Sequence, residues 1–180
     1  MIITISGKAG SGKSTVAKLV AKKLKMKHFS TGDFMREIAK EKGITLLKLS
    51  KFAEKDEEVD KLLDKRQTEF GKKEDNFVID SRLGFHFIPK SIKIFLKASL
   101  DVRAQRILKD KRGYNDVEKL KQEIIERENS ENKRYSDYYQ ILDYSDSIYY
   151  HLVVDTDNLD INDVVDEILN FVESGRKLYK

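Results

Sequence analysis

A short glycine-rich segment near the N-terminus has the residue types and spacing of a phosphate-binding loop. The segment from Gly7 to Ser14 fits the pattern G-x-x-x-x-G-K-[ST]. Its glycines allow backbone N–H groups to face a polyphosphate, and a helix that starts there adds partial positive charge. We expect Lys13 to reach the β- and γ-phosphates and the Ser14 hydroxyl to ligate Mg²⁺. The residues expected to bind the nucleotide are Gly7, Lys8, Ala9, Gly10, Ser11, Gly12, Lys13, Ser14 and Thr15.

A carboxylate and a guanidinium follow one of the predicted strands. The apolar run from Phe77 to Ile79 ends in Asp80, and Arg82 comes two residues later. At the carboxyl end of a strand beside the phosphate loop, Asp80 could hold Mg²⁺ or its waters together with Ser14. An acidic metal ligand beside a guanidinium is suited to phosphoryl transfer. Strands often end in Asp, so an ordinary strand end is the alternative for Asp80.

Alternating strand and helix patterns must position these residues. Residues 2–6 form a β-branched run that suits a buried parallel strand, and apolar residues recur at helical spacing from Val16 to Leu24. Further strands are predicted at 28–30, 77–80, 92–96 and 152–154, and further helices at 33–42, 59–70, 102–113, from 117 past 134, and 161–172. This alternation predicts an α/β fold with a five-stranded parallel sheet and helices on both faces.

Length and composition limit the possible classes of protein. The chain has 180 residues, 39% of them hydrophobic and 37% charged, without repeats or linker sequences, which predicts one domain over 1–180. The absence of cysteine excludes disulfides, thiolate zinc sites and a catalytic thiol. His28, His86 and His151 lack metal-ligand spacing. No apolar run reaches the roughly 20 residues of a membrane span, so we expect a cytoplasmic protein with no membrane partner.

The charge is mildly basic, with a formal net charge of +4. Because the basic residues are spread along the chain, we interpret them as a lysine-rich solvated surface and expect no nucleic-acid partner. A nucleotide-dependent nucleic-acid-binding module is the alternative from another functional class. Salt-sensitive binding to RNA or DNA would distinguish it.

Several further segments resemble one family of small kinases. The segment from Ser30 to Arg36 resembles the acceptor-binding segment of nucleoside monophosphate kinases. The segments 52–60, 80–84 and 126–135 resemble successive motifs of cytidylate kinases, especially the short archaeal-type branch. The resemblance covers nearly the whole chain. It implies a three-layer P-loop kinase fold, ATP as phosphoryl donor, Mg²⁺, and phosphorylation of CMP or dCMP to the diphosphate, with small nucleotides as partners.

The resemblance also implies roles for individual residues. Thr31 and Arg36 would hold the base side and the phosphate of the acceptor, and Arg82 would bind its phosphate. Arg106 would lie against the donor adenine and its phosphates. The remaining roles fall on one helix: Arg127 and Arg134 would clamp the transferring phosphoryl group and Glu131 would bind near the ribose. With Lys13, the arginines 82, 127 and 134 are the expected catalytic residues.

The spacing of Arg127, Glu131 and Arg134 places them on one helix face independently of any resemblance. The alternative is an exposed helix with surface ion pairs. Tyr135, Tyr138, Tyr139 and Tyr144 are expected to pack or to lie on an amphipathic surface rather than to stack on a base.

The resemblance to cytidylate kinases also implies two larger regions. A helical acceptor-binding region is expected at about 31–75, with Lys55 and Asp56 reading the acceptor base, although a solvated helix start is the alternative there. A cationic segment at 109–116, which includes Lys111, Arg112 and Gly113, is the expected lid over the donor. We expect a monomer and a frayed end over 174–180.

The identity of the acceptor base is less constrained by the sequence. Bacterial cytidylate kinases often carry an acidic residue where this chain has Leu83, and the segment from Thr31 to Asp33 is close to the adenylate kinase form. Adenylate kinase is therefore the first alternative, followed by shikimate kinase or another small-metabolite kinase.

Overall fold

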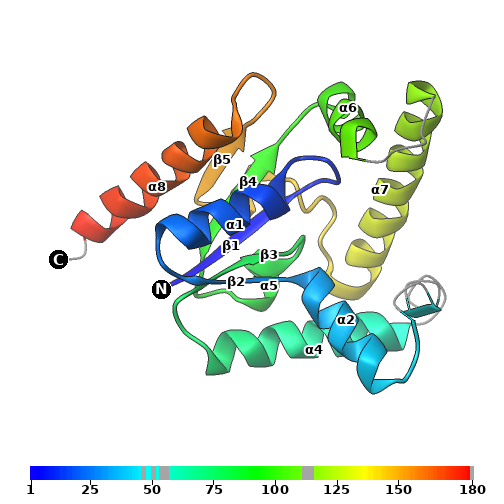
Figure 1. Cartoon of the computed structure of the whole chain (residues 1–180). Coiled ribbons are helices and arrows are strands. Elements are labelled where there is room, and N and C mark those ends of the chain that lie inside the picture. The colour runs from blue at the N-terminus through cyan, green and yellow to red at the C-terminus, as the bar shows by residue number, and fades with distance from the viewer. Residues whose placement is uncertain (46–47, 50–51, 53–56, 111–115, 179–180) are drawn as a thin grey trace.

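The computed structural model describes residues 1–45, 48–49, 52, 57–110 and 116–178. Its centre is one sheet of five strands: β1 (Ile2–Gly7), β2 (Lys27–Ser30), β3 (Phe77–Asp80), β4 (Ile92–Lys97) and β5 (Leu152–Asp155). The strand order is β2-β3-β1-β4-β5, and all neighbouring strands are parallel (Figure 1). The chain crosses from one side of β1 to the other after β3, so the carboxyl ends of β1 and β3 form the switch point where α/β proteins bind ligands.

Helices connect the strands, as parallel pairing requires. Their bounds are α1 (Lys13–Lys23), α2 (Thr31–Glu41), α4 (Glu57–Lys73), α5 (Gly84–Phe87), α6 (Leu100–Asp110), α7 (Val117–Tyr139) and α8 (Ile161–Leu178), with a 3₁₀ turn, η1 (Ser147–Tyr149), before β5. No helix in the described ranges is long and apolar enough to cross a membrane. The predicted five-stranded α/β architecture is confirmed.

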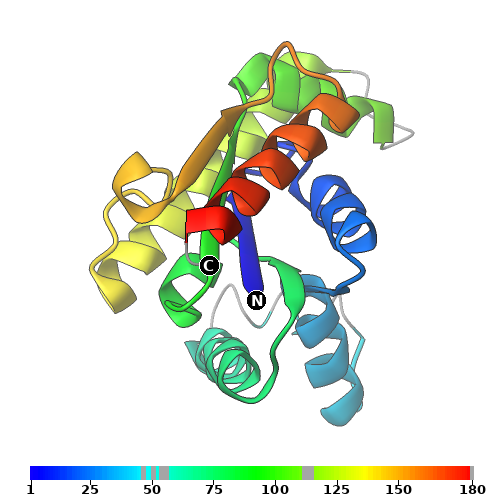
Figure 2. The same ribbon diagram turned by 90° about the vertical axis from the view of Figure 1, so that its left-hand side faces the viewer.

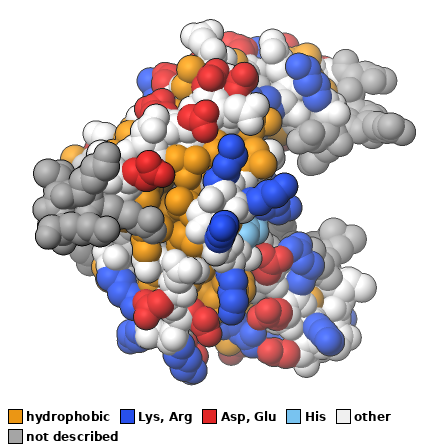
Figure 3. All heavy atoms as spheres, turned by 60° about the vertical axis from the view of Figure 1, so that its left-hand side comes forward, with side chains coloured by type: hydrophobic (Ala, Val, Ile, Leu, Met, Phe, Trp, Pro, Cys, Tyr) orange, Lys and Arg blue, Asp and Glu red, His pale blue; other side chains and the backbone are white. Residues whose placement is uncertain are grey.

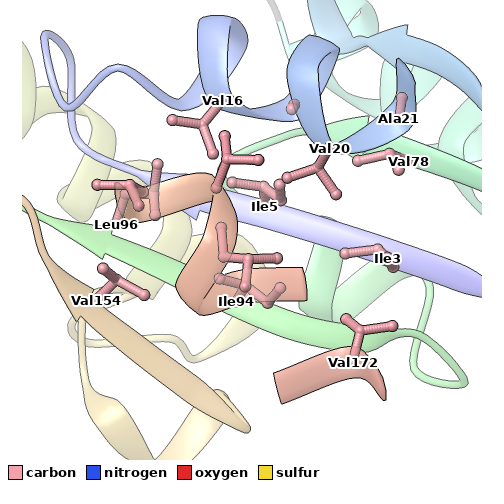
Figure 4. Packing of buried hydrophobic residues seen from close by; sticks show 14 of the residues in the cluster. Ile3, Ile5, Val16, Val20, Ala21, Val78, Ile94, Leu96, Val154 and Val172 are labelled. Atoms are coloured by element: carbon pink, nitrogen blue, oxygen red, sulfur yellow. The ribbon is translucent and has the colours of Figure 1, made fainter. Parts of the chain in front are cut away.

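One face of the sheet is covered by α1 and α8. Ile3 and Ile5 of β1 point to this face and pack with Val16 and Val20 of α1, and Val172 of α8 closes the same cluster (Figure 4). Because alternate strand residues point to opposite faces, Ile2 lies on the other side of the sheet. The spacing of apolar residues in α1 and α8 therefore reflects a single buried stripe on each helix.

The opposite face is covered by α2 and α4 beside β2 and β3. Phe77 and Ile79 of β3 pack there with Phe34 and Ile38 of α2 and with Leu63 of α4. Both α2 and α4 form the lower part of the molecule in Figures 1 and 2. A further cluster under β4 joins Phe95 to Leu83, Phe85, Ile141, Tyr144 and Tyr150. With helices on both faces, the sheet is the middle of three layers.

Several helix boundaries differ from the predictions: α4 and α6 each begin two residues earlier than expected, and α2 and α8 differ as well. α2 begins at Thr31, two residues before the predicted start, because Ser30 caps it: Ser30 Oγ accepts from the Asp33 N–H at 3.1 Å, and the Asp33 carboxylate accepts from the Ser30 N–H at 2.8 Å. The expectation of a frayed end from Ser174 is wrong over residues 174–178, where α8 continues to Leu178.

Candidate active site

The phosphate loop connects β1 to α1 and has the backbone that its glycines require. Gly10 and Gly12 adopt positive φ angles of 81° and 86°, which side chains disfavour. A Cβ atom at position 10 would lie 2.6 Å from the carbonyl oxygen of Arg103. Gly12 is the N-cap of α1, so the free N–H groups at the start of that helix face the loop. The loop is therefore shaped by close packing against α6 as well as by its own sequence.

The buried carboxylate of Asp80 lies beside the start of α1. In the sheet register Asp80 is opposite Ile5, which brings the end of β3 next to the phosphate loop. Ser14 Oγ donates a hydrogen bond to Asp80 Oδ2 at 2.6 Å, and His28 Nε2 lies 2.8 Å from Asp80 Oδ1. A hydroxyl and a carboxylate are hard oxygen ligands that suit Mg²⁺, which keeps most of its waters and binds substrate phosphates. The two side chains therefore fit the magnesium role expected of them.

Lys13 extends into a cavity of about 510 Å³ at the switch point of the sheet. Burial, together with the smaller effect of the Arg82 guanidinium, lowers the pKa of Lys13 to about 7, whereas Asp80 and Glu131 act in the opposite direction. The functional side chains that line the cavity come from the phosphate loop, β2, α2, the end of β3 and α7: Lys13, Ser14, His28, Thr31, Arg36, Asp80, Arg82 and Arg127. In Figure 3, Lys and Arg side chains gather beside a hollow on the right of the molecule.

Glu131 of α7 joins two of the expected catalytic arginines. Its Oε2 lies 2.8 Å from Arg82 Nε and its Oε1 lies 2.9 Å from Arg127 Nε. Glu131 is only 5% exposed, so the alternative of an exposed helix with surface ion pairs does not describe this residue, although the Arg127 side chain is largely exposed. The carboxylate holds one guanidinium from the sheet and one from the helix beside the same cavity.

Arg134 lies further along α7 and takes a different position. Its Nη1 is 2.7 Å from Oδ2 of Asp60 in α4. It is not among the described residues that line the cavity around Lys13. Spacing alone correctly placed Arg127, Glu131 and Arg134 on one helix, but the helix is long enough for its two arginines to reach different neighbours.

The expected acceptor residues of α2 lie at the edge of the same cavity. Thr31 Oγ1 donates to the Asp80 carbonyl oxygen at 3.4 Å, and Arg36 pairs with Asp33 one turn earlier in the helix. Other expected residues cannot be placed: Lys55 and Asp56, and most of the lid segment 109–116, lie outside the described residues.

Arg106 lies on the other side of the phosphate loop, in a second cavity of about 250 Å³. Its Nη2 donates to the Thr156 carbonyl oxygen at 2.6 Å and its Nη1 donates to Thr156 Oγ1 at 2.9 Å. Gly12 and Thr15 line the same cavity, together with apolar side chains that include Ile161 and Val164. An apolar slot beside the phosphate loop, edged by a fixed guanidinium, suits a flat aromatic ring attached to a phosphate chain.

Two functional candidates were missed by sequence reasoning. Arg103 of α6 is 4% exposed; its Nη1 donates to the Ala9 carbonyl oxygen at 3.2 Å and to the Glu128 carboxylate. Glu128 of α7 also lies 3.3 Å from Lys8 Nζ. Since both residues sit in highly charged helices, nothing in the local pattern marked them. His28 was considered only as a metal ligand, whereas the structure places it against Asp80.

The fold and this site define a class of protein. A phosphate loop at the switch point of a five-stranded parallel sheet, with a carboxylate beside its serine and arginines opposite, is the arrangement of P-loop kinases. The chain belongs to the cytidylate kinase-like family, whose model matches residues 2–158.

Curated relatives agree with this assignment, and a solved structure shares the fold. A cytidylate kinase of Methanobrevibacter smithii is 41% identical, over 94% of this chain and 96% of the relative. A cytidylate kinase of Methanocaldococcus jannaschii is 40% identical, over 98% of this chain and 100% of the relative. Among solved structures, shikimate kinase from Bacteroides thetaiotaomicron has a TM-score of 0.69 at 18% identity, covering 96% of this chain and 98% of that chain. The last likeness shows a shared fold.

Proposed function

We propose that the protein transfers the γ-phosphoryl group of ATP to a nucleoside monophosphate, with CMP and dCMP as the acceptors. One observation carries this proposal: Lys13, Arg82 and Arg127 converge on one cavity that also contains the Ser14–Asp80 pair. Relatives named cytidylate kinase, similar over almost the whole chain, support the choice of acceptor over AMP or shikimate.

The donor half of the site is built on the phosphate loop. The loop N–H groups and Lys13 would hold the β- and γ-phosphates, and Arg106 would border the adenine in the second cavity. Ser14 and Asp80 are the residues that would hold Mg²⁺, which neutralises charge on the transferring phosphate when bound. His28 fixes the orientation of the Asp80 carboxylate.

The acceptor half of the site faces the donor half across the larger cavity. Arg82 would bind the acceptor phosphate, Thr31 and Arg36 would border it, and Arg127 would reach the transferring group. In-line transfer needs no side-chain nucleophile, because positioning and charge neutralisation supply the catalysis. We assign residues 31–75 to acceptor binding, residues 109–116 to the lid, Glu131 to the ribose side, and a monomer to the working state.

The test is ADP production from Mg·ATP with CMP, dCMP, UMP, AMP, GMP and shikimate offered one at a time, beside a control without acceptor. We expect CMP and dCMP to give the largest stimulation. Preference for AMP would overturn the acceptor assignment, and turnover equal to the no-acceptor control with all six would overturn the kinase assignment.

A further inference from the structure

A third, smaller cavity lies between α4 and α7 and adjoins the cavity around Lys13. Its volume is about 60 Å³. The two cavities share Thr31, Ser81 and Arg82 in their walls. A nucleotide whose phosphate reaches Arg82 from the larger cavity therefore has the smaller one beside it. The small volume favours a single ring over a purine.

One face of α4 supplies the polar groups of this cavity. Asp60, Asp64 and Gln67 are spaced by four and three residues, and all three line it, whereas Leu83 and Phe87 give it an apolar surface. This is the pattern of a base-binding pocket, in which flat apolar contacts hold a ring and a few polar atoms read its edge.

The hydrogen bonds already present assign some of these polar atoms. Gln67 is 2% exposed, and its Oε1 accepts from Ser81 Oγ at 2.5 Å. With the amide oxygen used by Ser81, the amide nitrogen is the atom that can donate to a ligand. Asp64 accepts a hydrogen bond from the Tyr139 hydroxyl, and a carboxylate can accept several. Asp60 forms an ion pair with Arg134, and the charge of Arg134 also acts on the neighbouring Asp64.

The chemistry of pyrimidines makes such a pocket selective. Cytosine presents a 4-amino donor, whereas the equivalent position of uracil or thymine is a carbonyl acceptor. An ionised carboxylate only accepts hydrogen bonds, so it pairs with the amino group and repels the carbonyl oxygen.

We propose, on the basis of the function proposed above, that this cavity takes the pyrimidine base of the acceptor. Asp64 accepts a hydrogen bond from the 4-amino group of cytosine, and the Gln67 amide nitrogen donates to a ring acceptor. Asp64 is thus the residue that discriminates between CMP and UMP as acceptors. This assigns base reading to the middle of α4 instead of to Lys55 and Asp56.

The first experiment uses the unmodified protein and needs no variant. CMP is compared with pyrimidin-2-one ribonucleoside 5′-monophosphate, which lacks only the 4-amino group. We expect kcat/KM to fall about 10- to 100-fold for the analogue, the range for one well-formed base contact. Equal kcat/KM for the two acceptors would overturn the proposal. Whether CMP is phosphorylated tests the proposed function separately. Failure of the proposed function can therefore be distinguished from failure of the base-pocket proposal.

The second experiment assigns the contact to Asp64. In Asp64→Asn the side chain keeps its size but presents a donor, so we expect the CMP-to-UMP ratio of kcat/KM to fall about 10- to 100-fold. The matched control is Glu69→Gln, which changes an exposed carboxylate on the same helix. It should hold the ratio within about threefold, well under the tenfold that 1.4 kcal/mol represents. A ratio unchanged in Asp64→Asn would overturn the assignment, and if that variant does not fold, the analogue comparison decides the proposal alone.

Discussion

Arg103 of α6 and Glu128 of α7 form a buried ion pair directly behind the phosphate loop. Arg103 also donates to the Ala9 carbonyl oxygen, and Glu128 also pairs with Lys8. The pair thus attaches two helices to a loop whose own sequence is mostly glycine and small residues. Loop geometry at the donor site depends on charges that lie about 100 residues or more further along the chain.

Glu128→Ala should destabilise the protein and weaken donor binding, because it leaves the Arg103 charge buried without its partner. We expect a loss of about 3–5 kcal/mol in the free energy of unfolding. The KM for ATP should rise more than the KM for CMP, since the loop belongs to the donor half. Urea unfolding and steady-state kinetics measure the two effects. Glu118→Ala, at an exposed ion pair of the same helix, is the control and should cost about 0–1 kcal/mol.

Lys13→Ala should lower kcat by at least about 100-fold, because it removes a preorganised charge aimed at the transferring phosphoryl group. Since burial already lowers the pKa of this lysine to about 7, its loss should leave the unfolding midpoint unchanged or raised. Lys22→Ala in the last turn of the same helix is the control and should retain wild-type kcat. Retained turnover in Lys13→Ala would contradict the role of the loop.

His28→Ala should raise the Mg²⁺ concentration needed for half-maximal activity. The imidazole lies against Asp80 Oδ1, and removal of such an orienting partner typically costs about 10- to 100-fold in metal affinity or activity. Activity is measured against Mg²⁺ at saturating ATP and CMP. His151→Gln, at the β4–β5 edge of the sheet, is the control, and a Mg²⁺ dependence identical to that of the wild type would argue against a positioning role for His28.

The stability of the protein should depend on the ionisation of Asp64. The pKa of this carboxyl is raised to about 6, chiefly by burial and also by the neighbouring Asp60, although the hydrogen bond from Tyr139 and the charge of Arg134 act in the opposite direction. Between pH 4 and 6 the folded state therefore binds more protons at this position than the unfolded state does, so its contribution to stability falls as pH rises through that window. Urea unfolding of wild type and Asp64→Asn at pH 4.5 and 7.5 should show the variant gaining on the wild type at the higher pH. Parallel pH profiles for the two proteins would contradict the raised pKa.

The sheet, its flanking helices and the phosphate loop could be predicted because each is encoded by a local pattern. The β-branched run at residues 2–6 and the apolar stripe of α8 need only their own residues to be recognised. The contacts of Glu128 and the separation of Arg134 from the larger cavity could not be predicted. They depend on which charged residue of one helix meets which residue of another. In α7 the charged residues that reach the site are interspersed with those that reach solvent, and the local sequence pattern does not distinguish them. The roles that the resemblance implies for individual side chains stay predictions until the substitutions are measured.

Glu128 and Glu131 are three residues apart, so they belong to a single turn of α7. Glu128 reaches the phosphate loop through Lys8 and Arg103, and Glu131 holds Arg82 and Arg127 on the side proposed for the acceptor. That turn is a common mechanical support for both half-sites. A small rotation of this turn displaces both sets of charges together. We therefore expect the binding of one substrate to alter the affinity for the other. This coupling should disappear when either Glu128 or Glu131 is replaced by alanine.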